Sequence, residues 1–223
     1  MTDLTPADPA PGRARNPRGQ GDRLRDELIE AAAELLATAP HPDEVSIRSI
    51  ARAAGVSPTA AYRHFANRDE LVHAAVGSCF GEFAAEMAAA TANESDPFVR
   101  LRAAGRTYVE YAMAEHGRYR VLFSNPVQMS SELAADDSAG EAAFEQLVDL
   151  VQDCLDAGAV TSGNDAVYLS YQIWTWMHGI VDLRITHPLM EWPPAEQMVD
   201  DVVITLGLLR PNPADPAPSS DGS

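Results

Sequence analysis

Residues 46–65 read SIRSIARAAGVSPTAAYRHF, and this stretch decides the fold. Its first half has apolar side chains at helical spacing and begins with Ser46, a residue type that caps helix N-termini. Gly55 follows the last apolar position, where a glycine supplies the positive φ that reverses the chain. Ser57 and Pro58 then provide a second cap and a first helical position that needs no N–H. We therefore predict two short helices joined by a glycine turn.

The second of these helices, predicted over residues 58–65, presents small, hydroxyl, aromatic and cationic side chains to solvent. Two helices joined in this way form a helix-turn-helix, whose second helix fits the major groove of B-DNA. We expect Thr59, Ala60 and Arg63 to lie along base edges, with Arg63 forking onto guanine. The alternative interpretation is an ordinary helical hairpin with a solvated face.

The stretch continues into Arg68-Asp69-Glu70-Leu71, and with this continuation it resembles the DNA-binding domain of the tetracycline-repressor (TetR) family of bacterial transcription regulators. The resemblance covers about residues 22–80, and the motifs that carry it are Ile50-Ala51, Ala54-Gly55-Val56-Ser57 and Tyr62-Arg63-His64-Phe65. It implies that Tyr62 and His64 hold the DNA backbone. We expect Arg68 to contact phosphate as well, and Arg48 on the preceding helix is a further candidate.

Charge is distributed unevenly along the chain. The 223 residues include 33 acidic and 16 basic side chains, all of them arginine, which gives a net charge of −17. Residues 1–72 contain nine arginines and eleven acidic residues, so most of the negative charge lies after the proposed DNA reader. The acidic total therefore does not exclude binding to DNA.

Other function classes find little support. No HExxH, P-loop, GxSxG or dinucleotide-binding motif is present, so we expect neither an enzyme nor a bound cofactor or metal, although a centre assembled from distant residues stays open. Cys79 and Cys154 lie within apolar helical patterns and are interpreted as reduced core residues. Because no signal peptide or membrane-spanning run is visible, we expect a cytoplasmic protein.

The fold class predicted is all α: a three-helix helix-turn-helix domain joined by a long helix to a C-terminal helical bundle. We expect a disordered arm at 1–21, the DNA-binding domain at 22–68, a ligand-binding and dimerisation domain at 69–210 and a disordered tail at 211–223. Arginines in the arm either reach an adjacent minor groove or belong to a solvated tail. Predicted helices span 22–38, 67–90, 97–114, 116–123, 141–157, 165–186 and 194–209, and residues 124–139 are interpreted as a loop or frayed helix and a candidate lid.

Within the second domain, the pattern Trp174-x-x-x-His178-Gly179 resembles the C-terminal domain of the WHG type found in a subset of the same family. Trp174 and His178 lie one turn apart on one face of a helix. We expect them to line a pocket for a flat or hydrophobic effector, with His178 as its polar anchor and with the other lining residues Tyr108, Tyr111, Phe123 and Met177. The alternative for His178 is a packed histidine satisfied by a neighbouring hydroxyl.

Together these patterns favour a homodimeric repressor that binds a palindromic stretch of double-stranded DNA and leaves it when a small-molecule effector binds. The helices at 165–186 and 194–209 have enough apolar surface to form both the bundle core and a two-fold interface. Two alternatives remain from the sequence. One is a ligand-sequestering module or enzyme that retains a vestigial helix-turn-helix domain, and the other is a ligand-independent activator.

Overall fold

Helices make up all of the regular structure in the part of the chain that is described. The computed structural model describes residues 21–123, 138–160 and 162–208, and within these ranges it contains no strand. This confirms the predicted all-α fold. The predicted N-terminal arm, the candidate lid and the C-terminal tail lie almost wholly outside the described residues.

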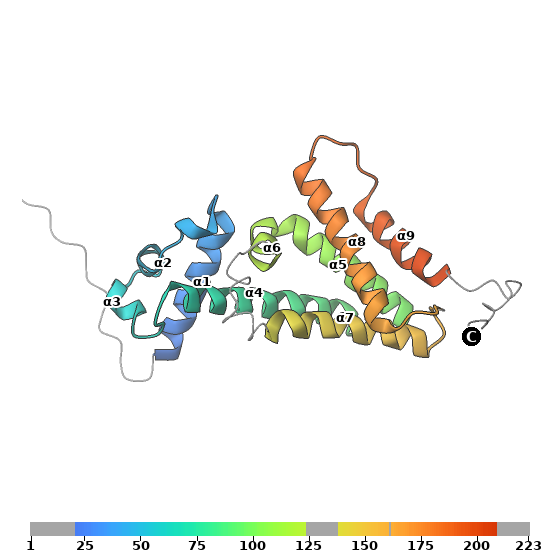
Figure 1. Ribbon diagram of the computed structural model, residues 1–223, viewed down its shortest axis with the longest axis horizontal. Coiled ribbons are helices and arrows are strands. Elements are labelled where there is room, and N and C mark those ends of the chain that lie inside the picture. The colour runs from blue at the N-terminus through green and yellow to red at the C-terminus, as the bar shows by residue number, and fades with distance from the viewer. Residues whose placement is uncertain (1–20, 124–137, 161, 209–223) are drawn as a thin grey trace, which may run out of the picture.

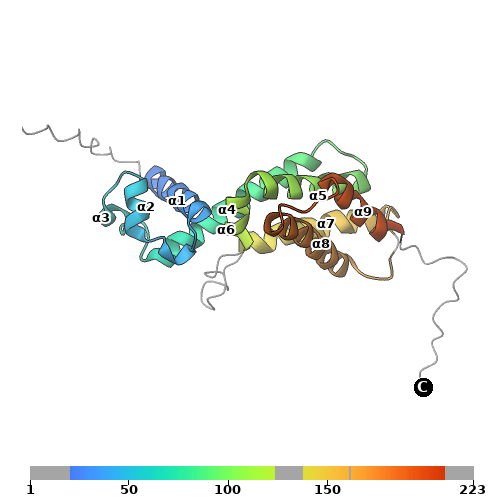
Figure 2. The ribbon, with the colours of Figure 1, turned by 90° about the horizontal axis from the view of Figure 1, so that it is seen from above.

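The helix-turn-helix elements gather at one end of an elongated molecule (Figures 1 and 2). They are α1 (Gly21–Thr38), the short 3-10 helix η1 (Pro42–Glu44), α2 (Ile47–Ala53) and α3 (Pro58–Ala61). The first helix packs against α2, and α2 packs against α3. Because α2 and α3 are too short to be stable alone, their angle depends on this packing.

A long helix, α4 (Arg68–Thr91), leaves this group and runs into the rest of the molecule (Figure 1). Its N-terminus is capped by the side chain of Asn67, which accepts a hydrogen bond from the backbone N–H of Glu70 at 2.8 Å. The Glu70 carboxylate in turn accepts the N–H of Ala66 at 2.6 Å. These bonds satisfy backbone donors at the start of the helix.

The remaining helices form the C-terminal bundle. They are α5 (Pro97–Ala114), α6 (His116–Phe123), α7 (Ser138–Asp156), α8 (Ala166–Thr186) and α9 (Ala195–Leu208). Helix α5 packs against α4, α7, α8 and α9, so it is the centre of the bundle. A Cβ atom at Gly105 on α5 would lie 2.9 Å from Cγ1 of Val199, and the absence of a side chain there lets α9 approach α5 closely.

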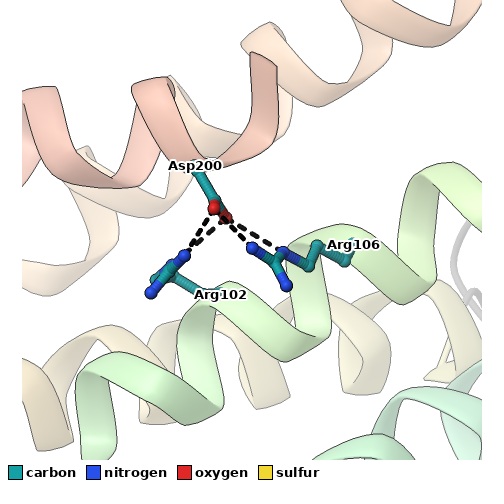
Figure 3. Close-up of polar contacts among 3 residues, drawn as sticks. All are labelled: Arg102, Arg106 and Asp200. Atoms are coloured by element: carbon teal, nitrogen blue, oxygen red, sulfur yellow. Dashed lines mark hydrogen bonds and ion pairs between the residues drawn. The ribbon is translucent and has the colours of Figure 1, made fainter. Parts of the chain in front are cut away.

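A charged contact fixes the same two helices further (Figure 3). The Nε atoms of Arg102 and Arg106 donate to one oxygen of Asp200 at 3.1 and 3.0 Å, and their Nη2 atoms donate to the other oxygen. Hydrogen bonds from the two guanidinium groups lower the pKa of Asp200 to about 2. Asp200 therefore stays ionised at neutral pH and holds α9 to α5.

The structure corrects the predicted length of the second helix of the motif. The second helix of the motif ends at Ala61 rather than at residue 65, because backbone bonds there change to three-residue spacing, as in Arg63 N–H to Ala60 O at 3.3 Å. The helix η1 was not predicted.

Cys79 and Cys154 are free and buried, and burial raises the pKa of each thiol to about 11, which confirms that they are core residues.

Candidate functional site

The helix-turn-helix is fixed by caps and by one glycine. Ser46 and Ser49 cap α2 reciprocally, each side-chain oxygen accepting the backbone N–H of the other residue at 3.1 and 2.9 Å. Gly55 has a φ of 69°, which is the left-handed conformation expected for the turn. The side chain of Ser57 accepts the N–H of Ala60 at 3.2 Å and so begins α3. All of these caps were predicted except the reciprocal bond from Ser49.

The inner side of α3 belongs to the core. Ala61 and Phe65 are fully buried, at four-residue spacing. The guanidinium of Arg25 on α1 stacks over the ring of Phe65, 5.2 Å from its centroid. Since the inner face is held in this way, the opposite face of α3 is fixed in direction as well.

That opposite face projects from the end of the molecule (Figures 1 and 2). Thr59 and Arg63 are exposed, Tyr62 is 52% exposed, and Ala60 and His64 are half-buried. The side chains of Thr59, Tyr62 and Arg63 have no hydrogen-bond or ion-pair partner among the residues that the structure describes. Polar and aromatic groups that are rigidly placed but unpartnered are available to contact a ligand as large as a DNA duplex.

Two further residues were predicted to contact DNA. Arg48 on α2 is exposed, like the side chains of α3. Arg68 differs, because its Nε and Nη2 atoms donate to the carbonyl oxygens of Val45 and Pro42 at 2.6 and 2.5 Å, and its Nη1 pairs with Asp69. The guanidinium ties the segment after η1 to the start of α4. This geometry favours a structural role for Arg68 over the predicted phosphate contact.

A large cavity lies inside the C-terminal bundle. It has a volume of about 1060 Å³ and is lined by residues of α4 to α9. The lining includes Tyr108, Phe123, Trp174, Met177 and His178, all of which were predicted to form a pocket. A volume of this size accommodates a drug-sized or larger molecule.

Tyr111 was predicted to belong to the same pocket, but it is not among the residues that line the cavity. Its ring packs edge-on against Phe83, with centroids 5.3 Å apart, and its hydroxyl oxygen is buried without a hydrogen-bond partner in the described chain. Burial raises the pKa of Tyr111. Phe83, which lines the cavity, contacts the rings of both Tyr111 and Tyr108, but only Tyr108 belongs to the lining.

A short hydrogen-bond chain ends at the cavity. The Tyr119 hydroxyl lies 2.7 Å from Nδ1 of His178 and 3.1 Å from the hydroxyl of Tyr108. Buried donors are nearly always satisfied, and Tyr119 is the only partner of the Tyr108 hydroxyl among the described residues, so Tyr108 donates to Tyr119. Tyr119 then donates to Nδ1, which places the ring proton of His178 on Nε2, a donor that has no partner among the described residues.

The protonation states follow from burial. Burial lowers the pKa of His178, against an opposing effect of Asp182, so the imidazole is neutral at pH 7. Burial raises the pKa of Tyr119 to about 12 and raises that of Tyr108 as well. The two interpretations of His178 made from the sequence are therefore compatible. A hydroxyl satisfies one ring nitrogen of His178, and the ring also lines the cavity.

Aromatic rings form much of the cavity wall. His178 meets Phe123 edge-to-face with centroids 4.5 Å apart and lies 5.2 Å from Trp174. Trp174 in turn contacts Phe144 of α7 at 5.7 Å, and Phe144 contacts Tyr171 at 4.8 Å. Such walls bury flat or hydrophobic molecules well.

The short helix α6 touches both the cavity and the helix-turn-helix domain. Arg118 pairs with Glu30 of α1 and, at 2.7 Å, with Glu82 of α4. Arg120 donates to the carbonyl oxygens of Ala37 and Ala39 at 3.1 and 2.7 Å, at the end of α1. The sequence did not predict these contacts, because each joins segments more than 35 residues apart and has no local pattern.

Helices α8 and α9 expose large hydrophobic side chains. These are Val167, Tyr168, Tyr171, Trp176, Leu183 and Ile204, and the loop between the helices adds Leu189 and Met190. Gly179 also belongs to α8, and a Cβ atom there would meet nothing within 4 Å. No helix among the described residues comes close to Gly179, which leaves room there for a neighbour.

Two kinds of site are absent from the part of the chain that is described. No group of three or more histidine, cysteine, aspartate or glutamate side chains is arranged to hold a metal ion. No helix in the described ranges has the length and apolar character that crossing a membrane requires.

Comparison with known proteins covers both parts of the chain. Residues 28–75 match the family model described as bacterial regulatory proteins of the tetR family, and residues 101–206 match the tetracyclin repressor-like C-terminal domain. A curated relative, the HTH-type transcriptional activator FasR of Mycolicibacterium smegmatis, is 28% identical over 144 residues. The match covers 64% of this chain and 65% of FasR, slightly less than two thirds of that protein.

Solved structures agree on the fold. A Rhodococcus protein of unknown function is 27% identical, with a TM-score of 0.69 over 82% of this chain and 95% of that one. FadR of Bacillus subtilis, solved with stearoyl-CoA, is 16% identical, with a TM-score of 0.70 over 82% of this chain and 97% of that one. Since the helix-turn-helix and the C-terminal bundle match models of one family, the chain belongs to the TetR family of bacterial regulatory proteins.

Proposed function

We propose that this protein is a homodimeric transcription repressor that binds an operator through α3 and releases it when a small hydrophobic or aromatic effector enters the cavity. The observation that carries the proposal is the position of α6. Phe123 at its end lines the cavity, while Arg118 and Arg120 in its middle hold α1 of the helix-turn-helix domain. We expect the protein to act in the cytoplasm, where bacterial DNA lies.

For DNA recognition, we assign base contacts to Thr59, Ala60 and Arg63. They lie in the first turn of α3 and directly after it, on the exposed end of the molecule. Arg63 presents a guanidinium that fits guanine O6 and N7, the commonest specific contact in the major groove. We assign Tyr62 and His64 to the DNA backbone, where they set the register of the reader.

The dimer is assigned to the exposed apolar surface of α8 and α9. A surface of this kind, with Gly179 on it and nothing from the described residues within 4 Å of a Cβ there, suits a close two-fold helix contact. In a dimer the two copies of α3 read successive major grooves about 34–36 Å apart, so the operator is expected to be a palindrome.

Release of the operator follows from a change in the distance between the two copies of α3. An effector packed against Phe123 and His178 favours one position of α6 over another, and α6 carries α1 with it. To empty an operator the effector must prefer the non-binding arrangement, and a shift from 1% to 99% requires about 5.5 kcal/mol. The cavity is therefore expected to change shape between the two states.

A second candidate is an activator, and the name of FasR favours it. Activation and repression use the same readers and differ in where the operator lies relative to the promoter, so the geometry supports both equally. The ligand-sequestering or enzymatic alternative finds less support, because the exposed face of α3 would then have no purpose. FadR binds stearoyl-CoA, but its 16% identity carries the fold and not the ligand.

The test begins by selecting bound fragments from random DNA with the full-length protein. We expect a palindromic consensus, bound by a dimer in sedimentation experiments. Compounds that raise the melting temperature are then added to the protein–DNA complex, and fluorescence anisotropy reports release. Sequence-independent DNA binding, together with tight ligand binding, would favour the sequestering alternative instead.

A further inference from the structure

Three carboxylates on α7 lie along the cavity and are four residues apart in the sequence. Glu141, Glu145 and Asp149 all belong to its lining, and all are exposed. In an α-helix this spacing places side chains in one row, about 6 Å apart along the axis. The row therefore runs beside the cavity on the side that is open to solvent.

The row is not neutralised by the rest of the lining. Arg100 is the only basic residue among the described residues that line the cavity, and its guanidinium pairs with Asp153 at 2.8 Å. None of the three carboxylates has a hydrogen-bond or ion-pair partner in the described ranges. The open side of the cavity therefore has a negative potential.

The stability of α7 does not require a row of unpaired carboxylates. Like charges four residues apart destabilise a helix by about 0.2–0.5 kcal/mol per pair. Helix α7 shows that other carboxylates can be paired, because Asp153 binds Arg100 and Asp156 accepts a hydrogen bond from Gln152 at 2.8 Å. The unpaired row is confined to the stretch that lines the cavity.

We infer that the effector is a hydrophobic cation, whose apolar body lies among the rings and whose ammonium or amidinium group faces the carboxylates of α7. Glu145 and Phe144, whose ring contacts Trp174, both line the cavity, so the charged row and the aromatic wall belong to one cavity. A cation gains both from carboxylates and from the faces of aromatic rings. This inference rests on the proposed function, because it takes the cavity to be the effector site.

The same geometry disfavours anions. A cleft with charges of one sign and apolar walls focuses the field and raises the local concentration of the opposite ion by about 10-fold or more. An anion of the same shape would enter against this field and find Arg100 already paired. The neutral imidazole of His178 offers a hydrogen-bond donor but no positive charge to compensate.

The test uses three probes with one hydrophobic body: biphenyl-4-ylmethylamine, biphenyl-4-ylmethanol and biphenyl-4-carboxylate. Their affinities for the full-length protein are measured by calorimetry at low salt and at high salt. We expect the cation to bind at least about tenfold more tightly than the anion, with the alcohol between them. The difference should shrink at high salt, because the carboxylates are exposed to screening.

Matched variants identify the source of the preference. The triple variant Glu141→Gln, Glu145→Gln, Asp149→Asn keeps the size of each side chain and should bring the three affinities together, within about threefold. Asp156→Asn on the same helix does not alter the lining and should keep the wild-type order. Because all four positions are exposed, melting temperatures should change little and will confirm folding.

Each other outcome overturns the inference. An anion that binds as tightly as the cation, a preference that survives in the triple variant, or no binding of the cation would each contradict it. The proposed function is tested separately by release of DNA. If the cation binds as expected and DNA is not released, the inference stands and the repressor proposal fails. If a neutral compound releases DNA and the cation does not, the repressor proposal stands and the inference of a cationic effector fails.

Discussion

At the scale of single residues, the helix-turn-helix separates side chains that hold the domain together from side chains left free. Arg25 stacks on Phe65 and Arg68 binds two carbonyl oxygens, so both cations stabilise the domain. Arg63 is exposed and has no partner in the described chain. Residue type alone does not distinguish these arginines, whereas their partners do.

The first prediction concerns Arg63. Arg63→Ala should weaken operator binding by about 1–3 kcal/mol and relax the preference at one base pair in each half-site, because the bidentate contact to guanine is lost. Arg23→Ala, which removes an exposed cation on α1, is the control for general electrostatics. Binding is measured by anisotropy against operators substituted at each position. Unchanged base preference in the Arg63 variant would remove this residue from base readout.

A second prediction concerns His178 and pH. Since burial lowers its pKa in the folded protein, the unfolded chain takes up a proton near the ordinary value of 6.5 while the native imidazole does not. The unfolded state then binds more protons, so the free energy of unfolding should fall as the pH is lowered below about 6.5. In His178→Gln this part of the pH dependence should be missing.

Denaturant unfolding of the wild type and the His178 variant between pH 5 and pH 8 measures this difference. Groups that titrate in both proteins cancel when the two curves are subtracted. Equal pH dependence in both would show that His178 is no less easily protonated in the folded protein. The variant also loses the hydrogen bond from Tyr119 at every pH. This loss shifts its free energy of unfolding by a constant amount and does not change how that free energy varies with pH.

At the scale of elements, α6 is the part on which the coupling depends. Its contact with α1 is close, since a Cβ atom at Gly117 would lie 2.7 Å from the carbonyl oxygen of Ala37. One turn later Arg120 binds the same carbonyl group. The helix therefore cannot shift without moving the end of α1 or breaking these bonds.

The third prediction uses this close contact. Gly117→Ala should reduce the free energy of unfolding by about 1–3 kcal/mol, because the methyl group collides with backbone, which cannot move aside easily. Gly81→Ala on α4 is the matched control: a Cβ atom there meets nothing within 4 Å, so alanine should stabilise the helix by about 0.5–1 kcal/mol. Urea unfolding of both variants gives the comparison. Similar stabilisation by both would mean that α6 is not tightly held against α1.

Sequence reasoning succeeded where the cause is local. The caps at Ser46 and Ser57 and the turn at Gly55 depend on neighbouring residues, and the structure confirms them. The end of α3 was wrong, because the chain tightens into three-residue bonds after Ala61 instead of continuing as a helix.

Contacts between distant segments were the part that sequence reasoning missed. The hydrogen bond of Tyr119 to His178 and the bonds of Arg120 to α1 join residues 59 and more than 80 positions apart. The absence of Tyr111 from the cavity wall has the same origin, since it depends on how its ring packs against Phe83 of α4, 28 positions earlier in the chain. Only the aromatic residues at helical spacing on α8 gave advance notice of the cavity.

At the scale of the whole molecule, α3 lies at one end and the C-terminal bundle makes up the other part (Figure 2). The cavity lies in this bundle, and α4 and α6 form the junction between the two parts. We expect an effect of a ligand on DNA binding to pass through this junction. By thermodynamic linkage, the ligand and the DNA then change each other's affinity by the same factor.

The most direct measurement of this coupling is the affinity of the cationic biphenyl probe for the free protein and for the protein saturated with its selected operator. The account predicts that the probe binds the DNA complex more weakly, by about 5- to 150-fold, and that saturating probe weakens operator binding by the same factor. Equal probe affinity in the two states would contradict it, because the cavity and the reader would then act independently.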